Sequence, residues 1–186
     1  MRWGSPIDGL TLKPFGPGGV PDTGALRHGW ADTRWGKVRI AWRDSEIMAC
    51  GFGVGPSPGL RPPTSGTQSR LDSEGAQAWV DLWMAGGSPQ ARGALLRVRA
   101  TPFQVRVWRA LLEVPRGARV SYGTLAARLG IPRGARAVGA ACGANPLALW
   151  VPCHRVVRAD GGLHGYRWGI DRKRDLLAWE AAPPSG

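Results

Sequence analysis

The stretch SYGTLAARLGIPRGARAVGAACGAN, residues 121–145, predicts two short helices joined by a tight link. Ser121 is a suitable N-cap for the first helix, in which Leu125 and Leu129 are four residues apart, and a glycine ends it. IPRG then leads into a second helix of very small residues that carries Arg136. This pattern is typical of a helix-turn-helix, although a purely structural helix pair has the same pattern.

The segment LALWVPCHRVV, residues 147–157, follows directly and places a thiol beside an imidazole and a guanidinium. A cysteine is a nucleophile only as a thiolate, so it needs a base within hydrogen-bond reach. Adjacent side chains usually point apart, so His154 would reach Cys153 through a water or a turn-like backbone, which Pro152 favours. The alternative is an inert buried cysteine beside a histidine that is bonded to the backbone.

The segment IDRKRDLLAWE predicts a final helix that starts near Asp171. Glu180 is four residues from Leu176 and three from Leu177, so it shares the face that those leucines bury. A carboxylate on a buried face needs a partner, and His154 is the candidate. The alternative is a glutamate in water at a frayed helix end.

The earlier part of the chain contains strand patterns. Residues 1–28 are rich in Gly and Pro without periodicity and predict an irregular extension. TRWGKVRIAWRDSEIMACGFG (33–53) alternates apolar and basic residues on both sides of Asp44–Ser45 and predicts a hairpin. GALLRVRA (93–100) predicts another strand, and from Thr101 the pattern becomes helical.

The fold class expected from these patterns is a two-domain α+β or α/β protein. Residues 29–100 would form a small N-terminal mixed α/β scaffold after the 1–28 extension. Residues 101–183 would form a mainly helical domain that contains the candidate helix-turn-helix and the Cys153–His154 dipeptide. The chain has 186 residues, of which 43% are hydrophobic, which is enough for two small cores.

The net charge of +12 is uneven along the chain. Residues 101–186 hold thirteen Lys and Arg against five Asp and Glu, whereas residues 1–100 hold twelve against eight. The second half is therefore expected to bind a polyanion. A GC-rich genome would also explain the excess of arginine over lysine, but it would not explain why acids are scarce after residue 100.

The sequence also favours a cytoplasmic protein with no membrane segment. It has no run of 18 apolar residues, and its N-terminus lacks the apolar stretch of a secretory signal. Cys50, Cys142 and Cys153 are an odd number without CxxC spacing, so neither a disulfide framework nor a cysteine-rich zinc site is expected. Cys50 and Cys142 are interpreted as packing residues.

Residues 102–180 resemble the active domain of the methylated-DNA–protein-cysteine methyltransferases, also called alkylguanine-DNA alkyltransferases. The matching segments are PFQVRVWRALLEVPRG, VSYGTLAARLG, ARAVGAACGANP, VPCHRVVRADGGLHGYRWG and RKRDLLAWE. A Pro-Cys-His-Arg core after Asn-Pro, at this distance from a helix-turn-helix, is a highly specific combination, and GYRWG is similar to the bacterial members. The first half resembles the family only through TRWGKVRIAW.

The resemblance implies a winged-type helix-turn-helix and a Pro-Cys-His-Arg active-site turn with defined roles. Cys153 would accept the alkyl group, His154 would act as the base through a water, and Glu180 would orient the imidazole. Asn145 would organise the active-site turn, and Tyr122 would donate its hydroxyl to the leaving guanine. The apolar run from residue 147 to 151 would form the strand that presents the cysteine.

The resemblance also implies a DNA-binding set and a pocket. A lesion inside a duplex must be flipped out, and Arg136 would fill the vacated stack. Trp168 would narrow the pocket, so that methyl is admitted and benzyl is resisted. The remaining DNA-binding residues would be Tyr122, Gly123, Ala135 and Arg155. The remaining pocket residues would be Val156, Tyr166 and Arg167.

The implied function is DNA repair by irreversible transfer of an alkyl group from guanine O-6 to the protein's own cysteine, with 4-O-alkylthymine as a further substrate left open. The partner would be duplex DNA carrying alkylated guanine, and the protein would be a monomer. No cofactor or metal is expected, since only His28 and Cys50 are available early in the chain for the zinc site of some members. The alternatives are a non-catalytic lesion-binding module, which would lack the cysteine, and a Cys–His–Glu hydrolase.

Overall fold

The computed structural model describes residues 12–14, 25–53 and 69–182, and the chain divides into two compact units. The described part of the first unit comprises residues 12–14, 25–53, 69–101 and 146–150. The described part of the second unit comprises residues 102–145 and 151–182. The chain passes from the first unit to the second between Thr101 and Pro102. Residues 146–150 belong to the first unit, whereas the predicted boundaries placed them in the second domain.

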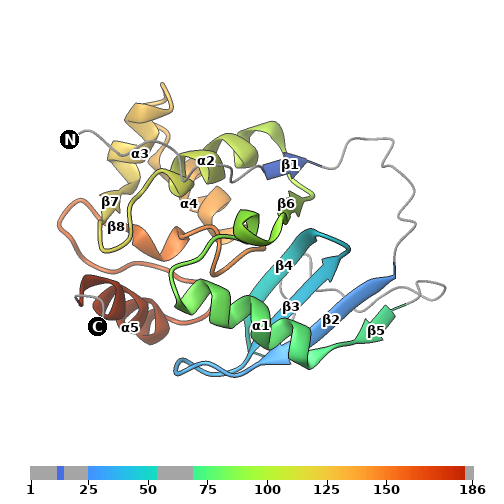
Figure 1. The fold of residues 1–186 in the computed structure, drawn as a ribbon. Helices are drawn as coiled ribbons and strands as arrows, with labels where there is room; N and C mark the ends of the chain where they lie inside the picture. The colour runs from blue at the N-terminus through green and yellow to red at the C-terminus, as the bar shows by residue number, and fades with distance from the viewer. Residues whose placement is uncertain (1–11, 15–24, 54–68, 183–186) are drawn as a thin grey trace. The chain divides into compact units, whose positions relative to one another are not determined.

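The first unit is built on a six-stranded mixed sheet (Figure 1). Its order is β1-β6-β4-β3-β2-β5, in which β2, β3 and β4 are antiparallel and the remaining pairs are parallel. The strands are β1 (Leu12–Pro14), β2 (Leu26–Ala31), β3 (Val38–Arg43), β4 (Glu46–Phe52), β5 (Ser69–Leu71) and β6 (Leu95–Val98). The predicted hairpin is confirmed as β3 and β4, and the predicted strand in 93–100 as β6.

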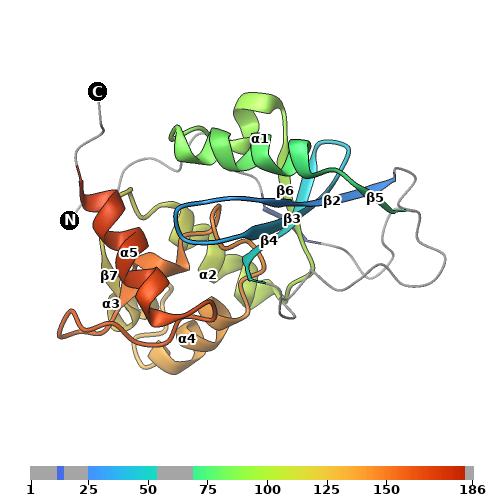
Figure 2. The same cartoon turned by 90° about the horizontal axis from the view of Figure 1, so that it is seen from below.

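Helix α1 (Ser73–Met84) packs on the sheet through contacts with β2 and β3 (Figures 1 and 2). Asp72 caps the helix, since its side chain accepts a 2.8 Å hydrogen bond from the Gly75 N–H. The approach is close, because a Cβ added at Gly29 would lie only 2.2 Å from the Asp72 carbonyl oxygen. A short 3-10 turn, η1 (Pro89–Arg92), leads from α1 to β6.

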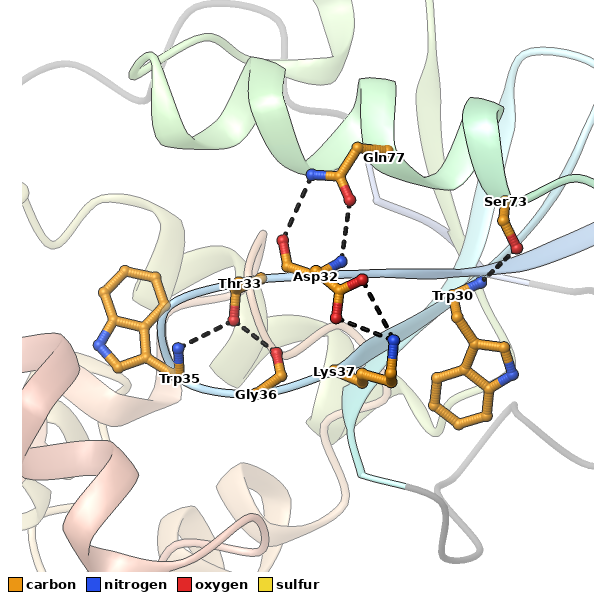
Figure 3. A network of polar contacts seen from close by, with 8 residues as sticks. All are labelled: Trp30, Asp32, Thr33, Trp35, Gly36, Lys37, Ser73 and Gln77. Atoms are coloured by element: carbon orange, nitrogen blue, oxygen red, sulfur yellow. Dashed lines mark hydrogen bonds and ion pairs between the residues drawn. The ribbon is translucent and has the colours of Figure 1, made fainter.

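Polar contacts fasten α1 to the end of β2 (Figure 3). The Asp32 N–H donates to Gln77 Oε1 at 2.8 Å, and Gln77 Nε2 donates back to the Asp32 carbonyl at 3.3 Å. Lys37 pairs with the Asp32 carboxylate at 2.9 Å, and the Trp30 N–H donates to the Ser73 hydroxyl at 3.3 Å. These contacts fix the β2–β3 turn against the helix.

The second unit is mainly helical, as predicted for this part of the chain. It contains α2 (Pro102–Leu112), α3 (Tyr122–Arg128), α4 (Ala135–Gly143) and α5 (Ile170–Ala181), with the short parallel pair β7 (Val120–Ser121) and β8 (Val156–Val157). Ser121 caps α3 by accepting a 3.0 Å hydrogen bond from the Thr124 N–H, as expected. Helix α4 contacts both α2 and α3, and Trp108 of α2 donates from Nε1 to the Ala141 carbonyl of α4 at 2.9 Å.

Two sequence predictions need correction. The segment Leu147–Val151 is not a strand: residues 148–150 form a turn, and Leu147 makes only an isolated bridge to Cys50. Two backbone hydrogen bonds of 2.8 Å hold the segment, one from Cys50 to Pro146 and one from Ala148 to Cys50. Its apolar character therefore reflects burial rather than membership of a strand.

The second correction concerns the predicted irregular extension over residues 1–28. Residues 12–14 form β1, and β2 begins at Leu26. Residues 1–11, 15–24 and 54–68 lie outside the described residues. No helix among the described residues is both long enough and apolar enough to cross a membrane.

Candidate active site

Cys153 begins a short 3-10 turn, η2 (Cys153–Arg155), directly after Pro152. This is the turn-like backbone expected from the proline. The thiol is 4% exposed, and Asn145 Nδ2 donates to it at 3.2 Å. The same amide nitrogen donates to the Val151 carbonyl at 2.8 Å. Asn145, fully buried at the end of α4, thus connects that helix to the turn and to the sulfur.

His154 and Glu180 form a buried pair between η2 and α5. His154 Nε2 lies 2.9 Å from Glu180 Oε1, and the side chains are 0% and 1% exposed. The predicted contact between the two residues is therefore present. Arg155 donates from Nε and Nη2 to the same carboxylate at 2.9 and 2.7 Å, and from Nη1 to the Val114 carbonyl at 2.5 Å.

The environment sets the ionisation of this pair. Burial alone would raise the pKa of the Glu180 carboxyl, but hydrogen bonds from His154 and Arg155 outweigh it and hold the pKa at about 2. Burial lowers the pKa of His154, and the hydrogen bond to Glu180 only partly opposes this effect. At neutral pH the imidazole is therefore neutral beside an ionised carboxylate. Nε2 then carries the proton donated to Glu180, which leaves the Nδ1 lone pair to accept a proton.

The His154 Nδ1 atom is buried and has no hydrogen-bond partner among the described residues. Burial raises the pKa of the Cys153 thiol to about 11, against the opposing effects of the Asn145 hydrogen bond and of the charges on Lys173 and Arg167. The resting thiol is therefore protonated at neutral pH. A reaction at this sulfur needs a base, and the neighbouring imidazole is suited to that task.

A cavity of about 1200 Å³ opens beside the thiol. It is larger than the roughly 300–1,000 Å³ typical of small-molecule sites, so it can admit a whole nucleobase. Of the predicted site residues, the lining includes Cys153, Tyr122, Ala135, Arg136, Tyr166 and Arg167. Residues that were not assigned to the site complete it: Gly139, Cys142, Gly143, Arg158, His164 and Gly165. Gly123 does not line the cavity but lies exposed at the start of α3.

Three further predicted site residues do not line the cavity. Arg155, predicted to bind DNA, is only 7% exposed, and its guanidinium donates hydrogen bonds to the Glu180 carboxylate and the Val114 carbonyl. Val156, predicted for the pocket, is fully buried in β8 and does not line the cavity. Trp168 does not line it either: it is 7% exposed and packs edge-on against Tyr166, with ring centroids 5.1 Å apart.

Sequence reasoning missed two residues near the thiol. Lys173 is fully buried and donates from Nζ to the Val156 carbonyl at 2.6 Å and to the His164 carbonyl at 3.0 Å. Its spacing of three and four residues from the buried leucines of α5 was a usable signal. Cys142 had been read as a packing residue; it is buried, but it also lines the cavity, and burial raises its pKa strongly.

The remaining cysteine, Cys50, lies fully buried in β4, and burial raises its pKa to about 12. It agrees with its interpretation as a packing residue. The part of the chain that the structure describes holds no group of three or more His, Cys, Asp or Glu side chains arranged to bind a metal ion.

The fold and the site define a mixed α/β protein with a buried thiol that accepts a hydrogen bond from an amide and lies beside a His–Glu pair. The family described as "6-O-methylguanine DNA methyltransferase, DNA binding domain" matches residues 102–182. A crystal structure of Mycobacterium tuberculosis OGT in complex with DNA superposes with a TM-score of 0.67 and 38% identity, covering 83% of this chain and 92% of that one. The chain therefore belongs to the O6-methylguanine-DNA methyltransferase family.

Curated relatives are similar over different lengths. The "Regulatory protein ada" of Salmonella typhimurium is 39% identical over 180 residues, which cover 93% of this chain and 50% of that protein. The "Methylated-DNA–protein-cysteine methyltransferase" of Mycobacterium bovis is 56% identical over 85 residues, which cover 46% of this chain and 52% of that protein. The chain thus spans about half the length of these relatives.

Proposed function

We propose that this protein repairs DNA by transferring an alkyl group from O-6 of guanine to Cys153, once and irreversibly. The observation that carries the proposal is the Cys153 thiol, which lines a cavity that can admit a base, accepts a hydrogen bond from Asn145 and is followed in the chain by the His154 of the His154–Glu180 pair. Membership of the family supports the same reaction.

In the proposed reaction, the Cys153 sulfur attacks the alkyl carbon while the bond from that carbon to guanine O-6 breaks. The thiol proton passes through a water to His154 Nδ1, which has no protein partner among the described residues. The Glu180 carboxylate stabilises the resulting imidazolium at 2.9 Å. The proton that the thiol releases balances the one that the departing guanine takes up.

Tyr122 is positioned to assist the leaving group. Its side chain lines the cavity, and its hydroxyl donates to the His164 carbonyl over a long 3.4 Å hydrogen bond. Burial, with smaller contributions from Cys142 and Cys153, raises its pKa to about 12. The hydroxyl therefore stays protonated at neutral pH and can donate to guanine as negative charge develops on it.

We propose that α3 and α4 form a winged-type helix-turn-helix that binds duplex DNA carrying the alkylated guanine. Arg136 supports this, because it is exposed near the start of α4 and lines the same cavity as the thiol. It can occupy the base stack while the lesion is flipped toward Cys153. Gly123 and Ala135, at the starts of α3 and α4, would lie against the DNA backbone. We further propose that the protein acts as a monomer in the cytoplasm.

The experiment incubates the protein with a duplex oligonucleotide carrying radiolabelled O6-methylguanine and counts methyl groups per protein. One methyl group on Cys153, located by peptide mass spectrometry, is expected. Zero transfer with retained binding would indicate a lesion-binding module, and more than one turnover would indicate a true catalyst. Cys153→Ser should bind but not transfer, because a hydroxyl is a poor nucleophile without a strong base. Cys50→Ser is the matched control and should transfer normally.

A further inference from the structure

Arg167 joins the active-site loop to the end of helix α4. The loop runs from Arg158 to Gly169 and contributes Arg158, His164, Gly165, Tyr166 and Arg167 to the cavity lining. Arg167 donates from Nε at 2.8 Å and from Nη2 at 2.5 Å to one acceptor, the Gly143 carbonyl. Gly143 is the last residue of α4 and also lines the cavity.

The chemistry of both partners favours this contact. The last carbonyls of a helix lack intrahelical partners and carry partial negative charge, so a cation that hydrogen-bonds there is stabilising. A planar guanidinium with two donors fixes the direction of its approach, which a lysine ammonium does not. The contact therefore orients the loop as well as holding it.

The loop is also held at a second point. The His164 carbonyl accepts hydrogen bonds from the Tyr122 hydroxyl of α3 and from Lys173 of α5. That point lies three residues before Arg167, and Gly165, with a φ of 33°, turns the chain between them. The loop is thus held at His164, which contacts α3 and α5, and at Arg167, which contacts the end of α4.

The charge on Arg167 also acts on Cys153. Arg167 from the loop and Lys173 from α5 both favour the thiolate and lower the pKa that burial raises. The other charged or titratable groups that line this cavity are Tyr122 of α3, Arg136 and Cys142 of α4, and Arg158, His164 and Tyr166 of the loop. Arg167 is exposed, so its effect on the thiol is screened by solvent and is smaller than that of a buried charge.

We propose that Arg167 is a positioning residue for the Cys153 cavity: its guanidinium holds the loop over residues 158–169 against the end of α4. Its charge acts on the thiol in addition, as a smaller effect. The proposal deepens the function proposed above, because it concerns the same thiol. It assigns to the loop a fixed position relative to the helix that carries Arg136. The end of α4 therefore provides the acceptor, the Gly143 carbonyl, that holds the loop in place as one wall of the cavity.

The test compares Arg167→Met, Arg167→Lys and the control Arg174→Met. Arg174 is an exposed arginine of α5 that pairs with Asp171 and does not line the cavity. Alkylation of Cys153 by iodoacetamide is followed at that residue by mass spectrometry from pH 7 to pH 11.5, and amide exchange is measured in the loop. Neither readout needs alkylguanine or DNA, so a failure of the proposed function would leave both interpretable.

For Arg167→Met, faster amide exchange in residues 163–168 and an apparent thiol pKa higher by about half a unit are expected, which is about a threefold lower rate on the rising limb. Arg167→Lys should restore the pKa of the Cys153 thiol but only part of the exchange protection, because lysine keeps the charge and loses the paired donation from Nε and Nη2. Arg174→Met should match the wild type. The same pKa in Met and Lys variants would overturn the electrostatic part, and wild-type loop exchange in Arg167→Met would overturn the positioning part.

Discussion

Glu180 Oε1 lies 2.9 Å from His154 Nε2, although Glu180 belongs to α5 and His154 to the turn that follows Pro152. The same carboxylate accepts two hydrogen bonds from Arg155. The buried Glu180 carboxylate therefore pairs with Arg155, which is always charged, and with His154, which becomes charged when it takes up a proton. Hydrogen bonds from His154 and Arg155 lower the pKa of this carboxyl and keep it ionised, so its negative charge is available to stabilise a protonated imidazole.

Replacing this carboxylate by an amide should weaken the relay. In Glu180→Gln, loss of the negative charge removes support for the histidinium that accompanies the thiolate, so methyl transfer should slow and the apparent pKa of Cys153 should rise. The rate of iodoacetamide reaction at Cys153 as a function of pH measures the second effect. Asp171→Asn, at the exposed start of the same helix, is the matched control.

The same variant leaves Arg155 buried without its anion, a change that costs roughly 3–5 kcal/mol in comparable buried pairs. The profile should therefore be recorded at a temperature at which circular dichroism shows the variant to be folded. A folded Glu180→Gln protein with the wild-type rate–pH profile would remove Glu180 from the relay.

Stability should fall in acid because of the His154–Glu180 pair. The Glu180 carboxyl has its pKa lowered from 4.5 to about 2, so its contribution is complete above pH 4.5 and is lost as the pH falls toward 2. That contribution is about 3 kcal/mol by the usual linkage conversion. The pKa of His154 is also lowered, so protonation of the unfolded chain below pH 6.5 acts in the same direction.

Urea unfolding between pH 7 and pH 3 measures this loss. The slope of unfolding free energy against pH below pH 4.5 should be smaller in Glu180→Gln than in the wild type, because the amide does not titrate. Equal slopes in the two proteins would show that other carboxyls dominate acid unfolding.

Arg136→Ala should slow repair of duplex DNA much more than reaction with free O6-alkylguanine. Arg136 is exposed on α4 and lines the cavity, so it can replace an extruded base but has no base to replace when the substrate is free. Unstacking a base costs a few kcal/mol, so the loss of the Arg136 side chain should lower only the rate of transfer from duplex DNA. Arg174→Ala is the control. Equal slowing on both substrates would instead indicate damage to the site itself.

The alkyl-size limit should depend on Tyr166 more directly than on Trp168. Tyr166 lines the cavity and Trp168 packs edge-on against it, so Trp168 supports the wall without forming it. The ratio of benzyl to methyl transfer should therefore increase in Tyr166→Ala. In Trp168→Gly it should increase only as far as the Tyr166 ring becomes mobile, and loss of the buried indole should destabilise the fold by about 3–5 kcal/mol.

Competition between the two oligonucleotide substrates measures this ratio, with Tyr166→Phe as the variant that keeps the ring. If Trp168→Gly changed the ratio while Tyr166→Ala did not, the wall would have been assigned to the wrong side chain.

Among the described residues, local patterns along the chain predicted four of the five α-helices, α2 to α5, but only three of the eight strands, β3, β4 and β6. The alternation around Asp44–Ser45 predicted the β3–β4 hairpin, and Ser121 predicted the start of α3, because strand periodicity and N-caps depend on near neighbours. The apolar run from Leu147 was misread as a strand, since periodicity cannot distinguish a buried turn from a buried strand in so short a segment.

By itself, the sequence determined the chemical constituents of the site: a cysteine after a proline, an adjacent histidine, and a glutamate on the buried face of a final helix. Only the tertiary structure decided what each cation does. Arg155 pairs with the Glu180 carboxylate, the buried Lys173 donates to the His164 carbonyl of the loop, and Arg167 donates to the Gly143 carbonyl at the end of α4. Side chains of equal charge and similar length have no distinguishing local pattern, so their roles depend on which acceptors the fold brings within about 3 Å of them.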